Sequence, residues 1–373
     1  MTHITEHKRI HLIGIGGCSM SGLASILKNR GYYVQGSDRA ESPFTERLKE
    51  LGVPVFIGHD AKNIGDCDLI IFSAAIKSDN VERAEAKRRG IPELERSEAL
   101  GQLTEGYESV VGIAGCHGKT TITSMLALIC EQGGPDATVH IGGFVDFLNG
   151  GVRLGAHDMF ITEACEYVES FLTLRPTIAL INNIDNDHLD YYGDMEHIVA
   201  AFKKFAALLP ENGLLIGNTD DFRVRALMAE HTGRKLSYGM KDADYTPANI
   251  TYDDNGCPGF DIMFRGEKLM HIQLRIPGEH SVMNAIAAAA VAREIGADNK
   301  CIVSALNAFR NTRRRFEYYG ERNGVKYYHD YGHHPSVIAA TMKAASNVMH
   351  NKLFCVFQCN SFTRAITLFL NDV

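Results

Sequence analysis

The fold of this chain is decided by one stretch, Val110-Val111-Gly112-Ile113-Ala114-Gly115-Cys116-His117-Gly118-Lys119-Thr120-Thr121. An apolar run enters the stretch, a glycine-rich turn follows, and residues 122–129 read as a helix. A strand, a tight turn and a helix N-terminus form a cradle for phosphate, because backbone N–H groups and the helix dipole point at the anion. Gly115 and Gly118 can take backbone angles that are closed to other residues, so phosphate can approach closely.

The side chains after the turn indicate a nucleotide. We expect Lys119 to reach the β- and γ-phosphates and the Thr120 hydroxyl to ligate Mg2+. The spacing departs from the general P-loop pattern, because Ile113 stands where its first glycine is expected. The alternative is an ordinary strand-to-helix turn with a surface lysine. The predicted phosphate-binding residues are Gly115, Cys116, His117, Gly118, Lys119, Thr120 and Thr121.

Composition describes an ordinary globular protein with more than one domain. The chain has 373 residues, too many for one typical core, and 45% apolar and 22% charged residues. A net charge of −7 argues against general nucleic-acid binding. Nine cysteines without a CxxC pair suggest neither a zinc ribbon nor a disulfide scaffold, and free thiols fit a reducing cytoplasm. With no signal-peptide core and no apolar run of membrane-spanning length, we expect a cytoplasmic protein.

The N-terminal part also begins with a glycine-rich turn. Residues 10–38 read as strand, turn, helix and second strand, and Asp38 ends this βαβ unit. A dinucleotide fingerprint requires glycine where the chain has Ser19. The turn therefore predicts an anionic diphosphate at a helix N-terminus more firmly than a nicotinamide ring. Asp38 has two interpretations, a bond to a ribose hydroxyl and a cap of the turn.

Strands alternate with helices in the following residues. The alternation through 53–89 indicates a doubly wound α/β domain. Ser73 follows the apolar run 69–72 at the C-terminal end of a strand, where such folds place ligands. The polar, glycine-bearing segment 98–107 is interpreted as a linker that leads to the phosphate turn.

Polar residues follow two apolar runs of the central part. Glu163 ends the strand pattern 159–162, and His188 follows the pattern 177–184. Both would lie at C-terminal strand ends beside the phosphate turn, where a carboxylate can hold Mg2+. Histidine is a less usual magnesium ligand, so capping the loop is an equal alternative for His188. Cys165 fits a small buried residue better than a nucleophile, because no Cys-His-Asn arrangement is evident.

Polar residues also precede an alanine-rich core helix. His280 and Asn284 are four positions apart and lie on one helical face, which suits a planar base. The arginine run 313–315 comes later. One arginine near a triphosphate would stabilise charge on the transferring phosphoryl group, and the alternative is a solvated turn.

The last part continues the strand pattern. Residues 325–329 read as a strand that ends in a polar loop with His333 and His334, and 352–358 read as another buried strand. Paired histidines suggest a metal site. Adjacent side chains point apart in regular structure and no third ligand is apparent, so we do not predict one.

The ordered set of motifs resembles the Mur ligases, the ATP-dependent amide-forming enzymes of peptidoglycan synthesis. The resemblance covers essentially the whole chain, and the set is specific although each piece alone is not. The pieces are Gly14-Ile-Gly-Gly-Cys-Ser-Met-Ser-Gly22, Gly115-Cys-His-Gly-Lys-Thr-Thr121, Glu163-Ala-Cys-Glu166, Asp187-His-Leu-Asp190, Pro277-Gly-Glu-His280 with Asn284, Arg314-Arg-Phe-Glu317 and Asp330-Tyr-Gly-His-His-Pro335.

The resemblance implies an α/β fold with three domains. Residues 1–106 would form a Rossmann-like domain that binds a UDP-sugar, and 107–311 a central P-loop ATPase-type domain that binds ATP. Residues 312–373 would form part of a Rossmann-like C-terminal ligase domain. That domain is longer in the family, so the resemblance implies either a fragment or a decayed copy. A decayed copy would keep binding where turnover is lost.

The resemblance also implies a role for each motif. Lys119 would bind the β- and γ-phosphates, and Arg314 or Arg315 would lie near the γ-phosphate. Thr120 and Glu163 would hold one Mg2+, and His188 a second. The adenine pocket would be lined by His280 and Asn284, and the ribose would lie near Asp330. The substrate and the incoming amino acid would face Tyr331, His333 and Arg364. The UDP-sugar would lie against Gly14, Gly16, Gly17, Ser19, Met20, Ser21, Asp38 and Ser73.

The implied activity joins L-alanine to UDP-N-acetylmuramate through an acyl phosphate, with ATP and Mg2+. Lys119, Glu163, His188, Arg315 and His333 would carry the chemistry. Alternatives are a tripeptide-adding, muropeptide-recycling ligase of the same family and a non-catalytic UDP-sugar or nucleotide-binding remnant. Ser19 and the second phosphate loop count against an NAD-dependent dehydrogenase. We expect neither nucleic acid nor membrane as a partner, and the sequence leaves the oligomeric state open.

Overall fold

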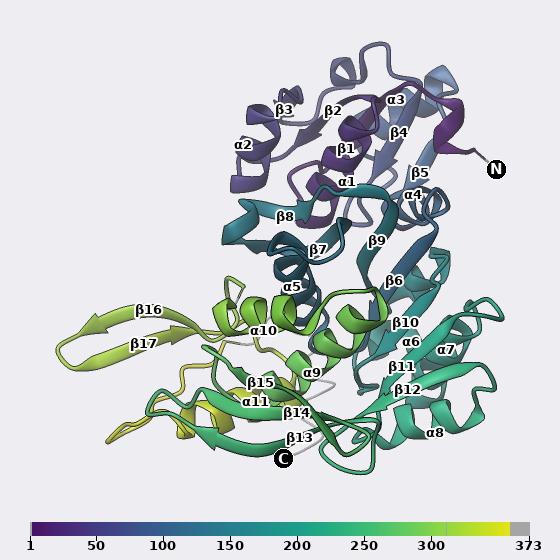
Figure 1. Cartoon of the computed structure of the whole chain (residues 1–373). Helices are drawn as coiled ribbons and strands as arrows, with labels where there is room; N and C mark the ends of the chain where they lie inside the picture. Colours follow the sequence, from purple (N-terminus) through teal and green to yellow (C-terminus); the bar gives the residue numbers. More distant parts are fainter. Residues whose placement is uncertain (1, 311, 359–373) are drawn as a thin grey trace. The chain divides into compact units, whose positions relative to one another are not determined.

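A computed structural model describes residues 2–310 and 312–358, whose helices and strands are labelled in Figure 1. The chain divides into two compact units. The first unit extends to Val111 and adds Ala137–Glu163 and Ser170–Pro176. The second unit contains Gly112–Asp136, Ala164–Glu169 and the residues from Thr177 onward. The α/β class predicted from the sequence is confirmed, and the division into three domains at 106 and 311 stays a prediction.

The first unit contains a parallel sheet with the strand order β3-β2-β1-β4-β5. Strand β1 lies at the centre, with Leu12 opposite both Gly36 and Ile71. The strand order reverses beside β1, and such sheets bind ligands at this switch point. The elements are β1 (Arg9–Ile13), α1 (Cys18–Asn29), β2 (Tyr33–Asp38), α2 (Pro43–Glu50), β3 (Val55–Ile57), β4 (Leu69–Phe72), α3 (Val81–Arg89), β5 (Glu93–Glu95) and α4 (Arg96–Thr104), with short 3-10 turns at Ile4–Glu6 and Ala61–Ile64.

Three further strands belong with the first unit. Strand β7 (Ala137–Val145) pairs in antiparallel fashion with β8 (Gly150–Arg153) and in parallel with β9 (Ala156–Ala164). The segment 98–107 is not a linker, because most of it lies in α4, where Ala99 and Leu100 are buried. Polar residues alternate with the apolar residues of one helix face, so the segment reads as polar in the sequence although that face is buried.

The second unit contains strands in the order β15-β14-β13-β12-β11-β10, followed by β6, whose residues from Gly112 onward belong to this unit. Strands β10, β11 and β12 run parallel, and β13, β14 and β15 form an antiparallel meander. Helix α9 packs against α5, and its alanine-rich middle is fully buried, as predicted. The elements are β6 (Ser109–Ala114), α5 (Lys119–Glu131), β10 (Ile178–Ile181), α6 (Leu189–Tyr192), α7 (Met195–Ala206), β11 (Leu214–Asn218), α8 (Phe222–Glu230), β12 (Arg234–Tyr238), β13 (Tyr245–Tyr252), β14 (Pro258–Phe264), β15 (Glu267–Gln273), α9 (Glu279–Glu294) and α10 (Asn299–Ala308).

The C-terminal segment of the second unit consists of a hairpin and a helix. Strands β16 (Glu317–Arg322) and β17 (Val325–His329) pair in antiparallel fashion, and α11 (Pro335–Ser346) follows. The predicted buried strand 352–358 is wrong, because these residues form no strand and Val356 is 98% exposed. An isolated strand leaves its backbone groups unpaired, and this stretch has no strand partner within the described chain.

Among the described residues, none of the helices combines the length and the apolar character that crossing a membrane requires.

Candidate functional site

The phosphate loop connects β6 to the N-terminus of α5, as the sequence predicts. Gly118 is the residue before the helix and has a φ of 86°, in the left-handed region. A Cβ atom at Gly118 would lie 2.4 Å from the Asn182 Nδ2 atom and 2.7 Å from the Asn284 Oδ1 atom. Only glycine fits, so the loop can keep its N–H groups close to a bound anion.

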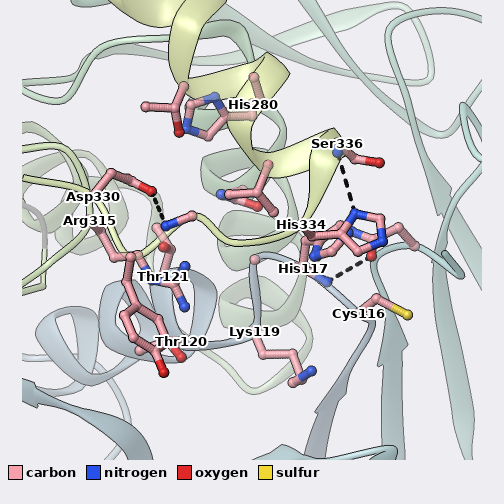
Figure 2. A pocket seen from close by; sticks show the side chains of 18 of the residues that line it. Cys116, His117, Lys119, Thr120, Thr121, His280, Arg315, Asp330, His334 and Ser336 are labelled. Carbon is pink, nitrogen blue, oxygen red and sulfur yellow. Dashed lines mark hydrogen bonds between the residues drawn. The ribbon is translucent and has the colours of Figure 1, made fainter. Parts of the chain in front are cut away.

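A cavity of about 320 Å³ opens beside the phosphate loop (Figure 2). Its volume falls within the usual range for small-molecule sites. Asn182 and His334 line it although the sequence interpretation gave them no role. Most of the predicted nucleotide-binding residues line it too, and so do two residues predicted to face substrate; together these are Cys116, His117, Gly118, Lys119, Thr120, Thr121, His280, Asn284, Arg315, Asp330, Tyr331 and His333.

The loop lysine is held by an acidic residue that the sequence interpretation did not single out. The Lys119 Nζ atom donates to the Glu166 Oε2 atom at 2.6 Å and to the Gly115 carbonyl oxygen at 2.5 Å. Burial works against the charge of the ammonium group, but the Glu166 carboxylate raises the pKa of Lys119 above its usual value. The cation is therefore preorganised at the phosphate loop. The motif Glu163-Ala-Cys-Glu166 contains this acid, but its spacing does not show which glutamate meets the lysine.

A group of possible cation ligands surrounds His188. Its Nε2 atom lies 3.8 Å from a carboxylate oxygen of Glu166 and 3.8 Å from one of Asp187. The ligand atoms of the three residues lie within 4.8 Å of one another. Carboxylate oxygens are the protein ligands that Mg2+ prefers, so the donor set fits this ion. His188 has a φ of 57° and its ring stacks on Tyr167, with 4.5 Å between the ring centroids.

Glu163, which the sequence interpretation placed with Thr120, belongs to the first unit. Its Oε1 atom accepts a hydrogen bond from the Gly142 N–H group at 2.5 Å. Its role as a metal ligand therefore stays a prediction.

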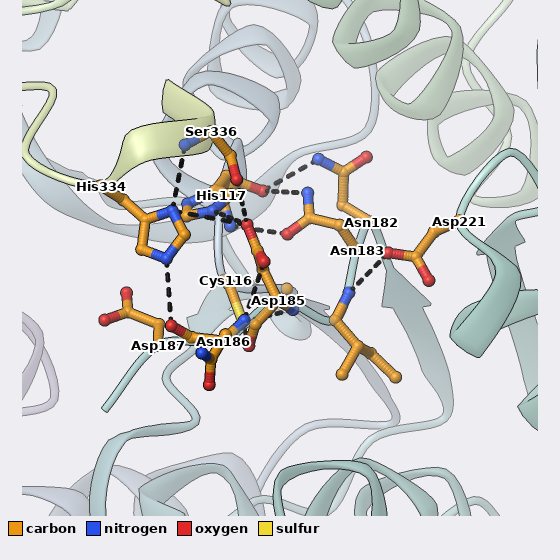
Figure 3. A network of polar contacts seen from close by, with 12 residues as sticks. Cys116, His117, Asn182, Asn183, Asp185, Asn186, Asp187, Asp221, His334 and Ser336 are labelled. Atoms are coloured by element: carbon orange, nitrogen blue, oxygen red, sulfur yellow. Dashed lines mark hydrogen bonds and ion pairs between the residues drawn. The ribbon is translucent and has the colours of Figure 1, made fainter. Parts of the chain in front are cut away.

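Asp185 is the centre of a polar network between the phosphate loop and the start of α11 (Figure 3). Its Oδ2 atom accepts hydrogen bonds from His117 Nε2 at 2.9 Å and from the Ser336 hydroxyl at 2.7 Å. Burial opposes ionisation, but these hydrogen bonds lower the pKa of Asp185 well below its usual range. His334 is buried beside Asp185, whereas the predicted His333 is half-buried and donates to the Tyr331 carbonyl oxygen. Only the fold reveals which histidine of the pair meets the loop.

The nucleotide-side residues around the cavity differ in how they are held. The Asp330 carboxylate accepts hydrogen bonds from the Phe316 and Gly332 N–H groups, so it braces the loop that carries Arg315. Arg314 is exposed and has a φ of 62°. Desolvation by the surrounding atoms lowers the pKa of His280, although the residue is exposed, so its ring is neutral at the cavity wall. Neutral rings can exchange hydrogen bonds with a base.

The glycine turn after β1 forms a second candidate site in the first unit. The Asp38 Oδ2 atom accepts a hydrogen bond from the Gly16 N–H group at 2.8 Å, so Asp38 caps the turn. A Cβ atom at Gly14 would touch the Ser73 Cβ atom at 3.4 Å, which places Ser73 beside the turn. The other predicted residues lie at the start of α1: Gly17 precedes its first turn, Ser19 is partly exposed, and Met20 and Ser21 are buried. Arg364 lies outside the described residues.

His140 anchors this turn from β7. Its Nε2 atom lies 3.1 Å from the Ser19 carbonyl oxygen, and its Nδ1 atom lies 3.2 Å from the Thr162 hydroxyl oxygen. The ring is 3% exposed, and burial lowers the pKa of His140 from 6.5 to about 4. The folded chain therefore keeps this ring neutral over a pH range in which the unfolded chain takes up a proton.

We expect His140 to make the stability of the chain depend on pH. Its contribution is complete above pH 6.5 and falls until about pH 4, by about 3 kcal/mol in total. Urea unfolding at several pH values, with the wild type and His140→Gln compared, measures this loss. His197→Gln is the control, because the His197 side chain is 71% exposed. Equal pH slopes for the wild type and His140→Gln would contradict the assignment.

Comparisons with known proteins assign nearly the whole chain to one family. The family models described as Mur ligase family, catalytic domain, as Mur ligase middle domain and as Mur ligase, glutamate ligase domain match residues 9–108, 113–292 and 314–364. A UDP-N-acetylmuramate–L-alanine ligase of Clostridium botulinum (strain Langeland) is 44% identical over 364 residues, which cover 98% of this chain and 80% of the relative. The enzyme of the same name from Clostridium beijerinckii is 45% identical over 365 residues, with the same coverage.

Solved structures show the same relationship. The crystal structure of UDP-N-acetylmuramate-alanine ligase from Thermotoga maritima has a TM-score of 0.81 and 29% sequence identity, and it covers 92% of this chain and 78% of its own. A murein peptide ligase from Psychrobacter arcticus has a TM-score of 0.77 and 25% identity, and it covers 94% and 81%.

Proposed function

The chain belongs to the Mur ligase family, and from that premise we propose that it joins L-alanine to UDP-N-acetylmuramate with the conversion of ATP to ADP and phosphate. The observation that carries the proposal is the cavity beside the phosphate loop, where Lys119 and Arg315 meet His280 and Asn284. Two cationic side chains suit a triphosphate, and the neutral polar pair suits a base. The names of the relatives at 44% and 45% identity support L-alanine as the amino acid.

The proposed reaction has two steps. A carboxylate oxygen of UDP-N-acetylmuramate attacks the γ-phosphorus of ATP, so that an O–P bond forms while the bond to the leaving ADP breaks. The neutral amine of L-alanine then attacks the acyl carbon. An N–C bond forms, the C–O bond to phosphate breaks, and the amine proton passes to solvent.

The residues of the cavity act mainly by position and charge. Lys119 would neutralise β- and γ-phosphate oxygens. The hydrogen bond to Glu166 holds the Lys119 ammonium group at the loop before the nucleotide binds. Arg315 would stabilise charge on the transferring phosphoryl group. Little covalent chemistry falls to the protein, so alignment of the reactants supplies most of the acceleration.

Divalent cation and sugar sites complete the proposal. Thr120 and Glu163 would hold one Mg2+, as the sequence predicts. His188 would help to hold a second, with Glu166 and Asp187 beside it. The bound cation would neutralise phosphate oxygens and orient them. The glycine turn after β1 would hold the UDP diphosphate at the N-terminus of α1. Free cysteines among the described residues fit the reducing cytoplasm in which we place the reaction.

The test is phosphate release from Mg-ATP and UDP-N-acetylmuramate, measured with and without L-alanine. We expect release that depends on L-alanine and an amide product of matching mass. Release that depends on L-alanyl-γ-D-glutamyl-meso-diaminopimelate instead would favour the recycling ligase, and a solved structure of 29% identity is named as a ligase for this peptide. Calorimetric binding of the UDP-sugar without release under either condition would favour the non-catalytic remnant.

A further inference from the structure

Three residues outside the proposed reaction join separate segments of the second unit. Asp185 follows β10, and His334 and Ser336 stand at the start of α11. Asp185 and His334 approach the His117 ring of the phosphate loop, and Ser336 donates to Asp185 (Figure 3). The segment that begins α11 directly follows the loop with Asp330, Tyr331 and His333, which line the cavity. This network is therefore the connection between two walls of one site.

The polar atoms of the network are paired. Asp185 Oδ2 accepts from the His117 ring at 2.9 Å and from the Ser336 hydroxyl at 2.7 Å. His334 donates from Nε2 to the Asn186 carbonyl oxygen at 3.0 Å, and its Nδ1 atom accepts from the Ser336 N–H group at 3.3 Å. Hydrogen bonds to an ionised carboxylate are about twice as strong as neutral ones, so Asp185 is the strongest link.

The phosphate loop is fixed at the same residue from its other side. The His117 N–H group donates to Asn183 Oδ1 at 2.8 Å. The His117 carbonyl oxygen accepts from Asn182 Nδ2 at 2.9 Å and from Asn183 Nδ2 at 3.0 Å. A displacement of the His117 ring would therefore shift the backbone that leads into Gly118 and Lys119.

We propose that Asp185 is a positioning residue that couples the docking of the segment 330–346 to the shape of the phosphate loop. The proposal rests on the proposed function, because it assigns the purpose of the coupling to nucleotide binding. A nucleotide that orders the loop then tightens the segment, and a docked segment raises the affinity of the loop for the nucleotide by the same factor.

A metal ion is the competing explanation for this cluster. Ligand atoms of His117, Asp185 and His334 lie within 4.8 Å of one another, a spacing that a transition metal accepts. The ring atoms and carboxylate already pair with one another and with Ser336 and Asn186, which favours direct hydrogen bonding.

Hydrogen exchange of the full chain without nucleotide tests the coupling independently of activity. We expect Asp185→Asn to speed exchange about tenfold or more both in residues 115–121 and in residues 332–346, since it removes charge-assisted hydrogen bonds. His334→Gln should affect the same two segments. The control is Asp194→Asn, because Asp194 caps α7 and asparagine caps a helix equally well. Faster exchange confined to one segment would overturn the proposal.

Binding of Mg-ADP supplies the second readout. We expect Asp185→Asn and His334→Gln each to weaken the binding of Mg-ADP about tenfold. The double variant should bind Mg-ADP no more weakly than the weaker-binding of the two single variants. Losses that add as independent effects would overturn the coupling. Ser336→Ala removes one donor only and serves if Asp185→Asn does not fold; it should change both segments to a smaller extent.

Two controls separate this inference from other outcomes. If chelator-treated wild type behaves like Asp185→Asn and Zn2+ restores it, the cluster is a metal site and the direct link is overturned. If the wild type binds no Mg-ADP but exchange changes together in both segments, the link stands and the proposed function fails.

Discussion

Lys119→Met is expected to lower alanine-dependent phosphate release about 10³-fold, because the ammonium group lies at the phosphate loop itself, against the Gly115 carbonyl oxygen. The lost ammonium group would neutralise charge that develops on the transferring phosphoryl group. The measurement is kcat with saturating substrates. Lys204→Met is the matched control, because Lys204 pairs with Glu169 on the surface of the same unit.

A second variant separates chemistry from folding. Lys119→Met leaves Glu166 buried at 2% exposure without its cation, which is itself destabilising. Lys119→Met combined with Glu166→Gln removes that unpaired charge, so it should recover stability while turnover stays low. Turnover within tenfold of the wild type in a folded Lys119→Met protein would contradict the role of the lysine.

The second large effect concerns stability of the first unit. Glu82→Ala is expected to lower the free energy of unfolding by about 3–5 kcal/mol. Glu82 is fully buried, and its carboxylate accepts hydrogen bonds from His11 Nε2 at 3.1 Å, from the Ser37 hydroxyl and from Asn63 Nδ2 at 2.7 Å. Removal of the carboxylate takes this acceptor from the buried His11 ring and the buried Ser37 hydroxyl. Urea unfolding measures the change, and Glu50→Ala on the surface of α2 should change little.

The same carboxylate gives a pH dependence with a known sign. Burial opposes ionisation, but the hydrogen bonds from His11, Ser37 and Asn63 outweigh it and lower the pKa of Glu82 below 4.5. A lowered pKa in the folded state means that the contribution is present above pH 4.5 and is lost as the pH falls through the folded value. A Glu82→Ala protein that unfolds at the same urea concentration as the wild type would contradict the network's role.

Local features of the sequence predicted the phosphate loop and the first βαβ unit. Both features are formed by consecutive residues: an apolar strand, then a glycine with a φ that other residues avoid, then the start of a helix. Gly118 and Lys119 are therefore identifiable from their immediate neighbours in the chain. The ordered motifs also predicted the family, since their succession along the chain does not depend on where each side chain points.

Only the tertiary structure decided which side chains meet. The Glu166 carboxylate, and not that of the predicted Glu163, accepts the hydrogen bond from Lys119. Glu166 and Lys119 are 47 positions apart in the chain. Asp185 pairs with His117 and Ser336, which are 68 and 151 positions away, and no spacing rule covers such distances. The apolar run 352–358 predicted a strand, but a strand exists only where a neighbour accepts and donates its backbone hydrogen bonds. Conformation at one residue follows from local sterics, whereas partnership follows from the packing of the whole chain, and that is why the sequence determined the loop and the fold determined its contacts.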